Sequence, residues 1–254
     1  MKIDAIFFDI DGTLVDIYTR QIPDSTFEAL RQLREKGIKL FICSGRHPSY
    51  REQLDKELKF TFDGYIFMNG QWITDINGNC LTSTSFDENT KKELYDYFEN
   101  NPDLYINVFD EKDMFANKVS PNKLVTTPVG DIKKMLKNNI YQLMVFGDRT
   151  QDEKLEKEIK GCKSARWNEW FADIIPSCGG KDKGIENTLK LFNINKENTM
   201  AFGDGGNDIP MFKAVNISVA MGNGDDYVKQ NAKMITDNCI DGGIYNALKK
   251  CEVL

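Results

Sequence analysis

The sequence predicts an α/β protein with a doubly wound parallel sheet and an inserted α+β module. Three observations support this fold class. Short apolar strands alternate with helices at both ends of the chain, which is typical of parallel sheets covered by helices on both faces. In the middle of the chain, predicted strands follow one another without a helix between them, which indicates antiparallel pairing. The 254 residues are enough for one domain that carries a second, smaller one.

The first 80 residues alternate between strands and helices. The apolar residues at 3–9 predict a buried strand. A helix is expected at 25–36, because Ser25 and Glu28 have the spacing of a capping box and Gly37 is a stop signal. The elements expected next are a strand at 38–43, a helix at 48–58, a strand at 64–68 and a hairpin that turns at Asn77 and Gly78.

Residues 84–180 have a different order of elements. A helix at 88–100 is followed by two adjacent strands, at 104–109 and 113–118. The elements expected next are a helix at 129–138, a strand at 140–146, a charged helix at 150–160 and two strands between 163 and 176. We therefore expect an inserted α+β module at 84–180 and a core made of 1–83 and 181–254. One continuous domain with an irregular sheet is the alternative.

The last part of the chain returns to the alternating order. The expected elements are helix 184–192, strand 199–203, helix 208–214, strand 216–220, helix 225–231, a short strand at 233–236 and a final helix. Strands from both ends of the chain are therefore expected to complete one parallel sheet.

Composition excludes several classes of protein. A net charge of −6 argues against a general surface for nucleic acid or for anionic membranes. Six scattered cysteines and one histidine lack the spacing of zinc sites and are typical of reduced thiols. The sequence contains neither a long apolar stretch nor a secretory signal pattern. We therefore expect a cytoplasmic protein without nucleic-acid or membrane partners, and the oligomeric state stays open.

A pair of aspartates ends the first predicted strand. Residues 6–8 are apolar, and Asp9 and Asp11 follow. Buried strands rarely end in two like charges without a reason. A calcium loop is disfavoured, because Leu14 stands where an EF-hand needs glycine and a strand precedes the loop. Two interpretations remain: a strand end that faces water, or a ligand site at the carboxyl end of a central strand.

Two carboxylates at such a sheet edge suit phosphoryl transfer. Asp9 can attack a phosphoryl group and form an aspartyl-phosphate. Asp11 can protonate the leaving oxygen and then deprotonate water. Gly12 lets the chain turn sharply, and Thr13 offers a hydroxyl and an N–H group near the phosphate.

Other predicted strand ends carry groups that suit the same chemistry. These groups are Ser44, Gly45 and Arg46 after strand 38–43, Lys181 and Lys183 before helix 184–192, and Asp204 and Asp208 after strand 199–203. Because the carboxyl ends of parallel strands meet at one edge of a sheet, we expect these side chains to converge. Four such matches in order are far more specific than one.

Together these motifs are similar to those of a known family. DIDGT at 9–13, SGR at 44–46, KG at 183–184 and GDGGND at 203–208 resemble the haloacid dehalogenase superfamily of aspartate-nucleophile phosphatases, in its Cof-type branch (subfamily IIB). The resemblance implies a Rossmann-like core, with the module at 84–180 as a cap that covers the site and selects the substrate. It also implies Mg²⁺-dependent hydrolysis of a small phosphorylated metabolite, with a sugar phosphate favoured.

The resemblance implies a role for each matched residue. Asp9 corresponds to the nucleophile and a metal ligand. Asp11 corresponds to the general acid and base, with its backbone carbonyl also near the metal, and Asp204 corresponds to the remaining protein ligand.

The other matched residues are expected to bind the phosphate and the substrate. Ser44 and Lys183 resemble the pair that orients the phosphate, and Lys183 is preferred to Lys181 because it directly precedes a glycine. Asp208 corresponds to the acid that holds the lysine and the metal waters, and Asn207 to the asparagine on the substrate side. Thr13, Gly45 and Arg46 complete the expected set around the phosphate.

The module at 84–180 contains an aromatic stretch, RWNEWFADI at 166–174. It can be aromatic packing under a sheet, or it can place Trp170 or Asp173 against the leaving group. Caps of related proteins often carry an acid at the position of Asp173, which favours a substrate contact for this residue. His47 is expected to be a polar loop residue near the mouth of the site.

Two other functions are considered. A phosphomutase of the phosphomannomutase kind would need a second phosphate site in the cap, where Arg149 and Arg166 are the only arginines. A non-catalytic phosphate-binding regulatory module is disfavoured because all four motifs are intact.

Overall fold

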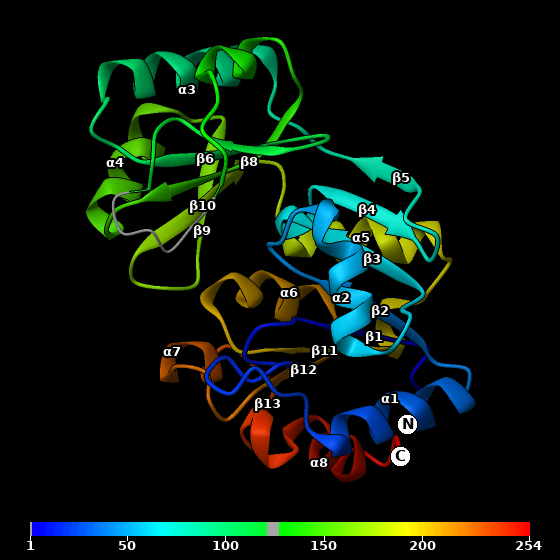
Figure 1. Cartoon of the computed structure of the whole chain (residues 1–254). Helices are drawn as coiled ribbons and strands as arrows, with labels where there is room; N and C mark the ends of the chain where they lie inside the picture. The colour runs from blue at the N-terminus through cyan, green and yellow to red at the C-terminus, as the bar shows by residue number, and fades with distance from the viewer. Residues whose placement is uncertain (1, 121–126) are drawn as a thin grey trace.

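The larger of two sheets contains strands from both ends of the chain (Figure 1). The structure is a computed structural model that describes residues 2–120 and 127–254. The strands of this sheet lie in the order β13 (Met234–Ile235), β12 (Ile217–Ala220), β11 (Thr199–Gly203), β1 (Ala5–Phe8), β2 (Lys39–Cys43), β3 (Gly64–Phe67), β4 (Trp72–Asp75) and β5 (Cys80–Ser83). The strands from β13 to β3 pair in parallel, and β4 and β5 pair antiparallel.

Helices cover both faces of this sheet. Along β1, Ile6 and Phe8 point to one face and Phe7 to the other, because side chains of a strand alternate. The first face packs against α1 (Asp24–Glu35), α2 (Arg51–Leu58) and α8 (Gly243–Lys250). The second face packs against α5 (Lys181–Leu191), α6 (Ile209–Ala214) and α7 (Asp226–Lys229). The predicted doubly wound α/β core is therefore confirmed.

The second sheet is antiparallel and is built from the middle of the chain. Its order is β7 (Met114–Ala116), β6 (Ile106–Asp110), β8 (Ile140–Phe146), β10 (Phe171–Pro176) and β9 (Cys162–Arg166). One face packs against α3 (Glu88–Asn100), α4 (Arg149–Glu158) and the 3₁₀ helix η3 (Ile132–Leu136). Figure 1 shows α3 on the side away from the larger sheet.

The other face of the second sheet points toward the larger sheet. Alternation along β10 sends Ala172 and Ile174 into the module's own apolar core and leaves Asp173 for the opposite side. Along β6, Asn107 and Phe109 are likewise on the side of a cavity between the two sheets. This arrangement is what a cap over the carboxyl edge of the core requires.

Three helices differ from their predicted form. The first begins at Asp24 after Pro23, so Ser25 lies inside the helix and the predicted capping box is wrong; the carbonyl of Pro23 accepts the first bond instead. The helix predicted at 129–138 is the shorter 3₁₀ helix η3. Helix α5 begins at Lys181, three residues earlier than predicted. This last difference changes the assignment of a site residue.

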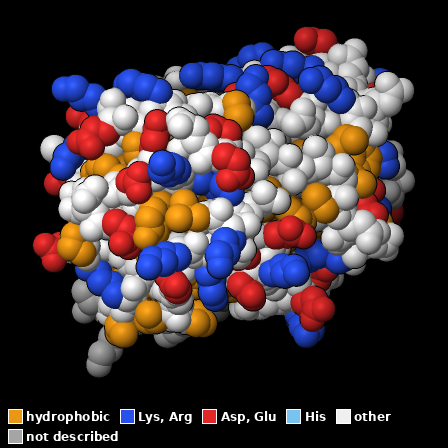
Figure 2. Space-filling model, turned by 90° about the horizontal axis from the view of Figure 1, so that it is seen from above, with side chains coloured by type: hydrophobic (Ala, Val, Ile, Leu, Met, Phe, Trp, Pro, Cys, Tyr) orange, Lys and Arg blue, Asp and Glu red, His pale blue; other side chains and the backbone are white. Residues whose placement is uncertain are grey.

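The surface is mixed in charge. Figure 2 shows acidic and basic side chains interspersed on the face that it presents, with small groups of hydrophobic side chains between them. Within residues 2–120 and 127–254, no helix has the length and apolar character needed to cross a membrane.

Candidate active site

The carboxyl edge of the larger sheet and the second sheet enclose a cavity of about 750 Å³. Core residues that line it include Asp9, Asp11, Ser44, Gly45, Arg46, Asp204 and Asn207. The second sheet contributes Asn107, Phe109, Met144, Phe171 and Asp173. The loops that follow β1, β2 and β11 thus bring together groups that lie far apart in the sequence, as expected for the ends of parallel strands.

A buried lysine joins the first and last motifs. Nζ of Lys181 lies 2.6 Å from Oδ1 of Asp9 and 2.6 Å from Oδ1 of Asp208. The lysine side chain is fully buried. Although burial disfavours its charged form, the carboxylates of Asp208 and Asp9 raise the pKa of Lys181, so it stays an ammonium at neutral pH.

The predicted role of Lys183 is wrong. Its side chain is half-exposed and pairs with Glu186 at 2.8 Å on the surface of α5. Successive helical residues are rotated by about 100°, so residues two positions apart point in nearly opposite directions. Because α5 begins at Lys181, this residue faces the site and Lys183 faces solvent.

Three carboxylates cluster around this lysine. Ligand oxygens of Asp9, Asp204 and Asp208 lie within 4.8 Å of one another. Burial raises the pKa of Asp9 to about 7, although Lys181 opposes this shift. Burial and the charge of Asp9 raise the pKa of Asp204 well above its ordinary value. When all three acids are ionised, they and the one ammonium carry an excess of two negative charges, which a divalent cation would neutralise.

The hydrogen bonds of the acids indicate which of them could hold a cation. Both oxygens of Asp208 are engaged: Oδ1 accepts from Lys181, and Oδ2 accepts from the backbone N–H groups of Asp204 and Gly205, each at 2.9 Å. Thr13 donates its hydroxyl to Oδ1 of Asp204 at 2.8 Å. Asp9 and Asp204 are therefore the two carboxylates best placed to share an oxygen-ligated ion such as Mg²⁺.

Thr13 does not have the place predicted for it. It is fully buried, its hydroxyl is used by Asp204, and its N–H donates to the carbonyl of Ile10 at 3.2 Å. Thr13 thus orients the carboxylate of Asp204 and does not line the cavity. Gly12 adopts a φ of 89°, and a Cβ at this position would overlap the carboxylate of Asp204, which explains why glycine is needed.

Two arginines hold Asp11. Arg46 makes a bidentate contact, with Nε 3.0 Å from Oδ2 and Nη2 2.8 Å from Oδ1. Arg20 donates from Nη1 to Oδ1 at 2.8 Å. Although burial opposes the shift, the hydrogen bonds and charge of Arg46 and Arg20 lower the pKa of Asp11. Arg46, predicted to grip phosphate, is thus engaged by Asp11 in this structure.

The cap side of the cavity is organised around Asp173. Its Oδ2 accepts from Nδ2 of Asn69 at 2.8 Å and from Nε1 of Trp167 at 3.3 Å. Burial raises the pKa of Asp173 to about 7. Trp167 lines the cavity. Trp170, by contrast, is 62% exposed, and its backbone N–H donates to Oδ1 of Asn168. The alternative that placed Trp170 against the leaving group is therefore wrong.

His47 is more deeply buried than predicted. It is 1% exposed, and Nδ1 accepts from the N–H of Ser49 at 3.1 Å. The other ring nitrogen, Nε2, therefore carries the proton and donates to the carbonyl of Asp110 at 3.0 Å. Asp110 ends β6, so this hydrogen bond joins the core to the second sheet.

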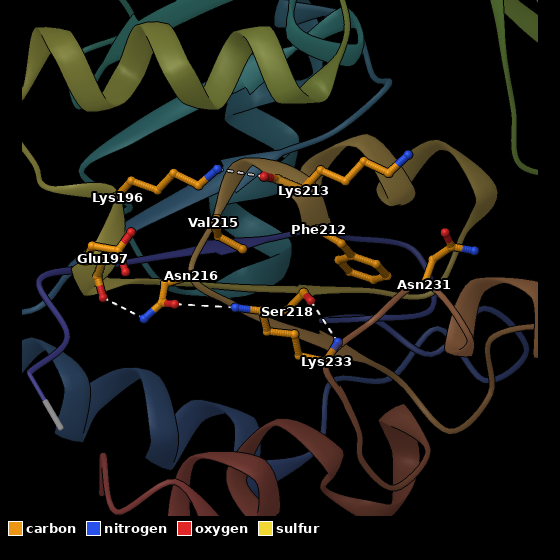
Figure 3. Close-up of a pocket in the computed structure, with 9 residues that line it drawn as sticks. All are labelled: Lys196, Glu197, Phe212, Lys213, Val215, Asn216, Ser218, Asn231 and Lys233. Carbon is orange, nitrogen blue, oxygen red and sulfur yellow. Dashed lines mark hydrogen bonds between the residues drawn. The ribbon is translucent and has the colours of Figure 1, made fainter.

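A second hollow lies elsewhere on the core, near β12 and α6 (Figure 3). It measures about 440 Å³ and its lining includes Lys196, Lys213 and Lys233. Lys196 donates to the carbonyl of Lys213 at 2.8 Å. Asp9, Asp11 and Asp204 line the other cavity, which is therefore the candidate active site.

Comparison with known proteins agrees with this geometry. A family model described as haloacid dehalogenase-like hydrolase matches residues 6–248. The chain belongs to the haloacid dehalogenase-like hydrolases. The resemblance inferred from the motifs is thereby confirmed.

Several relatives of this haloacid dehalogenase-like hydrolase match it over almost their whole length. YkrA of Bacillus subtilis strain 168, which carries a provisional phosphatase name, is 30% identical and covers 100% of both chains. The solved structure of BT4131, described as a subclass IIB sugar phosphatase, is 31% identical with a TM-score of 0.87 and covers 99% of this chain and 100% of its own. BT1666, a phosphatase from Bacteroides thetaiotaomicron, is 28% identical with a TM-score of 0.91 and covers 100% and 96%. This hydrolase is accordingly a phosphoric monoester hydrolase with a small phosphorylated substrate.

Proposed function

We propose that this haloacid dehalogenase-like hydrolase is a Mg²⁺-dependent phosphatase that hydrolyses sugar phosphates through an aspartyl-phosphate. The observation that carries the proposal is the buried Lys181, which contacts both Asp208 and the cavity-lining Asp9. The similarity to a protein described as a subclass IIB sugar phosphatase supports the substrate class. We keep the predicted division of the chain, with 84–180 as the cap and 1–83 with 181–254 as the core.

In the first step, an oxygen of Asp9 forms a bond to phosphorus while the ester P–O bond breaks. The leaving alcohol oxygen takes a proton from Asp11. Lys181 steadies Asp9 and adds positive charge where the transferring phosphoryl group develops negative charge. Ser44 and the adjacent Gly45, which both line the cavity, are left to contact the phosphate oxygens.

In the second step, water attacks the phosphorus of the aspartyl-phosphate and gives its proton to Asp11. The acyl P–O bond breaks, which releases phosphate and restores Asp9. The low pKa of Asp11 suits this basic role. For the acid role in the first step, Asp11 has to hold a proton, so Arg46 or Arg20 has to give up a contact as the leaving group arrives.

The carboxylates of Asp9 and Asp204 and the backbone carbonyl of Asp11 are the groups that would hold Mg²⁺. When bound, the ion supplies the positive charge that allows an anionic nucleophile to approach a phosphate dianion. Asp208 keeps Lys181 and the loop at 204–205 in place through the contacts of its two oxygens.

A phosphomutase is the second candidate, and one contact argues against it. A second phosphate site in the cap would need an available arginine. Arg166 is buried in an ion pair with Asp152, with Nε 2.6 Å from Oδ2, and also donates to the carbonyls of Gly147 and Asn168. Only Arg149 remains among the cap arginines.

A non-catalytic phosphate-binding module would have no need for the buried lysine and acids.

The experiment that tests the proposal compares Asp9→Asn with Asp11→Asn. Asp9→Asn should abolish turnover, because an amide is not a nucleophile. Asp11→Asn should lose the proton-transfer contribution, about 10²–10⁴-fold, and should accumulate a phosphorylated protein that intact-mass spectrometry can detect. Substantial turnover by pure Asp9→Asn protein would rule out the covalent mechanism.

A further inference from the structure

A turn after β3 adopts an unusual backbone conformation. In η2 (Met68–Gly70), φ is 50° at Met68, 54° at Asn69 and 104° at Gly70. A left-handed backbone costs little at Gly70 but is costly at Met68 and less so at Asn69, and such strain persists only where surrounding contacts impose it. The buried position of all three residues shows that the surroundings do so here.

The contacts of this turn connect the separate parts of the site. The N–H of Met68 donates to the carbonyl of Arg46, and the N–H of Asn69 donates to the carbonyl of Ser44, each at 2.9 Å. A Cβ on Gly70 would overlap the carbonyl of Gly180, the residue before Lys181. The turn is therefore packed against both the loop after β2 and the start of α5.

The side chain of Asn69 extends this connection to the cap. It is 1% exposed, and its Nδ2 donates to Oε1 of Gln142 at 2.9 Å and to Oδ2 of Asp173 at 2.8 Å. Its Oδ1 accepts from Nδ2 of Asn207 at 3.0 Å. Gln142 in turn donates to the carbonyl of Gly45 at 3.1 Å. Each of these donors meets an acceptor, so one amide group joins two cap residues to the core loop at 203–208.

These contacts leave one oxygen of Asp173 for a ligand. Oδ2 is shared by Asn69 and Trp167. Oδ1 is buried and has no hydrogen-bond partner among the residues that the structure describes, although Asp173 lines the cavity. Leaving a buried carboxyl oxygen without a donor is costly. Because Oδ1 has almost no accessible surface, a substrate hydroxyl group reaches it after a small shift of the surrounding side chains and then forms a strong hydrogen bond.

We propose that Asn69 is a positioning residue that fixes Asp173 so that its Oδ1 accepts a hydroxyl group of the leaving group. The same amide holds Asn207, so the cap contact and the core loop are set relative to each other by one side chain. The proposal rests on the proposed phosphatase function and deepens it. It specifies a phosphate ester whose alcohol carries a further free hydroxyl within reach of Asp173.

Asn69→Gly is the variant that tests this role. Glycine adopts the left-handed conformation of Asn69 without strain, so the variant removes the amide and keeps the turn. Asn193→Gly is the matched control, because Asn193 is an exposed asparagine with a φ of 53° that does not line the cavity. Thermal melting of both variants checks that they fold.

The kinetic measurement is the ratio of kcat/KM for the preferred sugar phosphate to kcat/KM for acetyl phosphate, which has little leaving group to contact. Asn69→Gly should lower this ratio by about tenfold or more, since discrimination by a buried hydrogen bond is large. Asp173→Ala should lower it similarly, and the double variant should fall no further, because both changes remove one interaction. Asn193→Gly should keep the wild-type ratio. Equal losses on both substrates in Asn69→Gly would overturn the proposal.

A spectroscopic measurement is independent of catalysis. The indole N–H resonance of Trp167, identified with Trp167→Phe, should move in Asn69→Gly because both side chains share Oδ2 of Asp173. It should stay in place in Asn193→Gly. If the Trp167 resonance does not move in Asn69→Gly, the proposal is overturned, whether or not the protein hydrolyses sugar phosphates. If the resonance moves but the wild-type protein hydrolyses no sugar phosphate, only the substrate class is overturned. Asn69→Asp, which keeps the side-chain shape but replaces the donor by a carboxylate oxygen, should lower the same kinetic ratio; a wild-type ratio there would also count against the proposal.

Discussion

Nζ of Lys181 lies 2.6 Å from Oδ1 of Asp9, although 172 positions separate the two residues. This contact joins the carboxyl end of β1 to the N-terminus of α5. It shows that Lys181, and not Lys183, is the lysine that contacts Asp9. The first prediction follows from this pair.

Replacing the two lysines by methionine should have very different effects. Lys181→Met should lower kcat/KM by about 10²–10³-fold, the usual effect of removing one group that stabilises developing charge. Lys183→Met should stay near wild type, because its half-exposed ammonium contacts only Glu186 on the surface of the helix and such surface changes are small. Steady-state kinetics on one phosphate ester measures both. A larger loss in Lys183→Met than in Lys181→Met would contradict the assignment.

Removal of divalent cations should abolish activity. EDTA should stop turnover and Mg²⁺ should restore it, whereas Ca²⁺ should restore it poorly because it prefers more ligands and longer bonds. Asp204→Asn should raise the Mg²⁺ concentration for half-maximal activity by about tenfold or more. Asp226→Asn, at a side chain that is 92% exposed, is the matched control. Undiminished turnover in exhaustive chelator would exclude a metal requirement.

The stability of the protein should depend on pH through Asp173. Burial raises its folded pKa to about 7 from 3.8, so between these values the folded state binds the proton more tightly than the unfolded state. The wild type should therefore lose stability as pH rises from about 4 to 7, relative to Asp173→Asn, which cannot ionise. The limit of this effect is about 4 kcal/mol, from about 1.4 kcal/mol per pKa unit.

Urea unfolding of both proteins at pH 5 and pH 8 measures this difference. The amide oxygen of Asp173→Asn can still accept from Asn69 and Trp167, so the variant isolates the ionisation. A difference in the free energy of unfolding that is the same at both pH values would show that Asp173 ionises normally.

Closure of the cap can be tested at Gly206. A Cβ at this position would lie 2.6 Å from the backbone carbonyl oxygen of Arg166 in β9. Gly206 lies at the start of the 3₁₀ helix η5 (Gly206–Asp208), so alanine should obstruct the approach of the cap without straining the turn. We expect Gly206→Ala to lower kcat/KM for a sugar phosphate by about tenfold and to leave the melting temperature within a few degrees of wild type. Wild-type turnover of the sugar phosphate would mean that this approach is not needed for catalysis.

The sequence predicted the core well because its signals are local. Apolar runs that end in acids, hydroxyls or glycines can be recognised from neighbouring residues alone and predict strands with polar ends. Parallel strands then bring their carboxyl ends to one edge of the sheet. The positions of Asp9, Asp11, Ser44, Asp204 and Asn207 around one cavity follow from that rule. The antiparallel module was predicted from the same kind of evidence, since adjacent strands without a helix pair as hairpins or meanders.

The residues that sequence reasoning missed act through long-range contacts. Asn69 lies 73 positions from Gln142 and 104 from Asp173, and Trp167 was passed over for its more exposed neighbour Trp170. One signal for Asn69 was available: an Asn-Gly pair that directly follows a buried strand suggests left-handed backbone. The residues that such a turn contacts cannot be predicted from the local sequence.

The sequence by itself determined the doubly wound core, the inserted module and the acidic groups at the strand ends, because these depend on periodicity and on residue types at fixed positions. Only the tertiary structure decided which lysine contacts Asp9 and Asp208. A helix turns each side chain by about 100° from the last, so the direction of Lys181 depends on the residue at which α5 begins. That start follows Gly180, whose φ of 127° and contact with Gly70 are set by packing against a distant turn. The same packing selects the hydrogen-bond partners of Asp173, because a buried polar group takes whichever donors the folded chain brings to it.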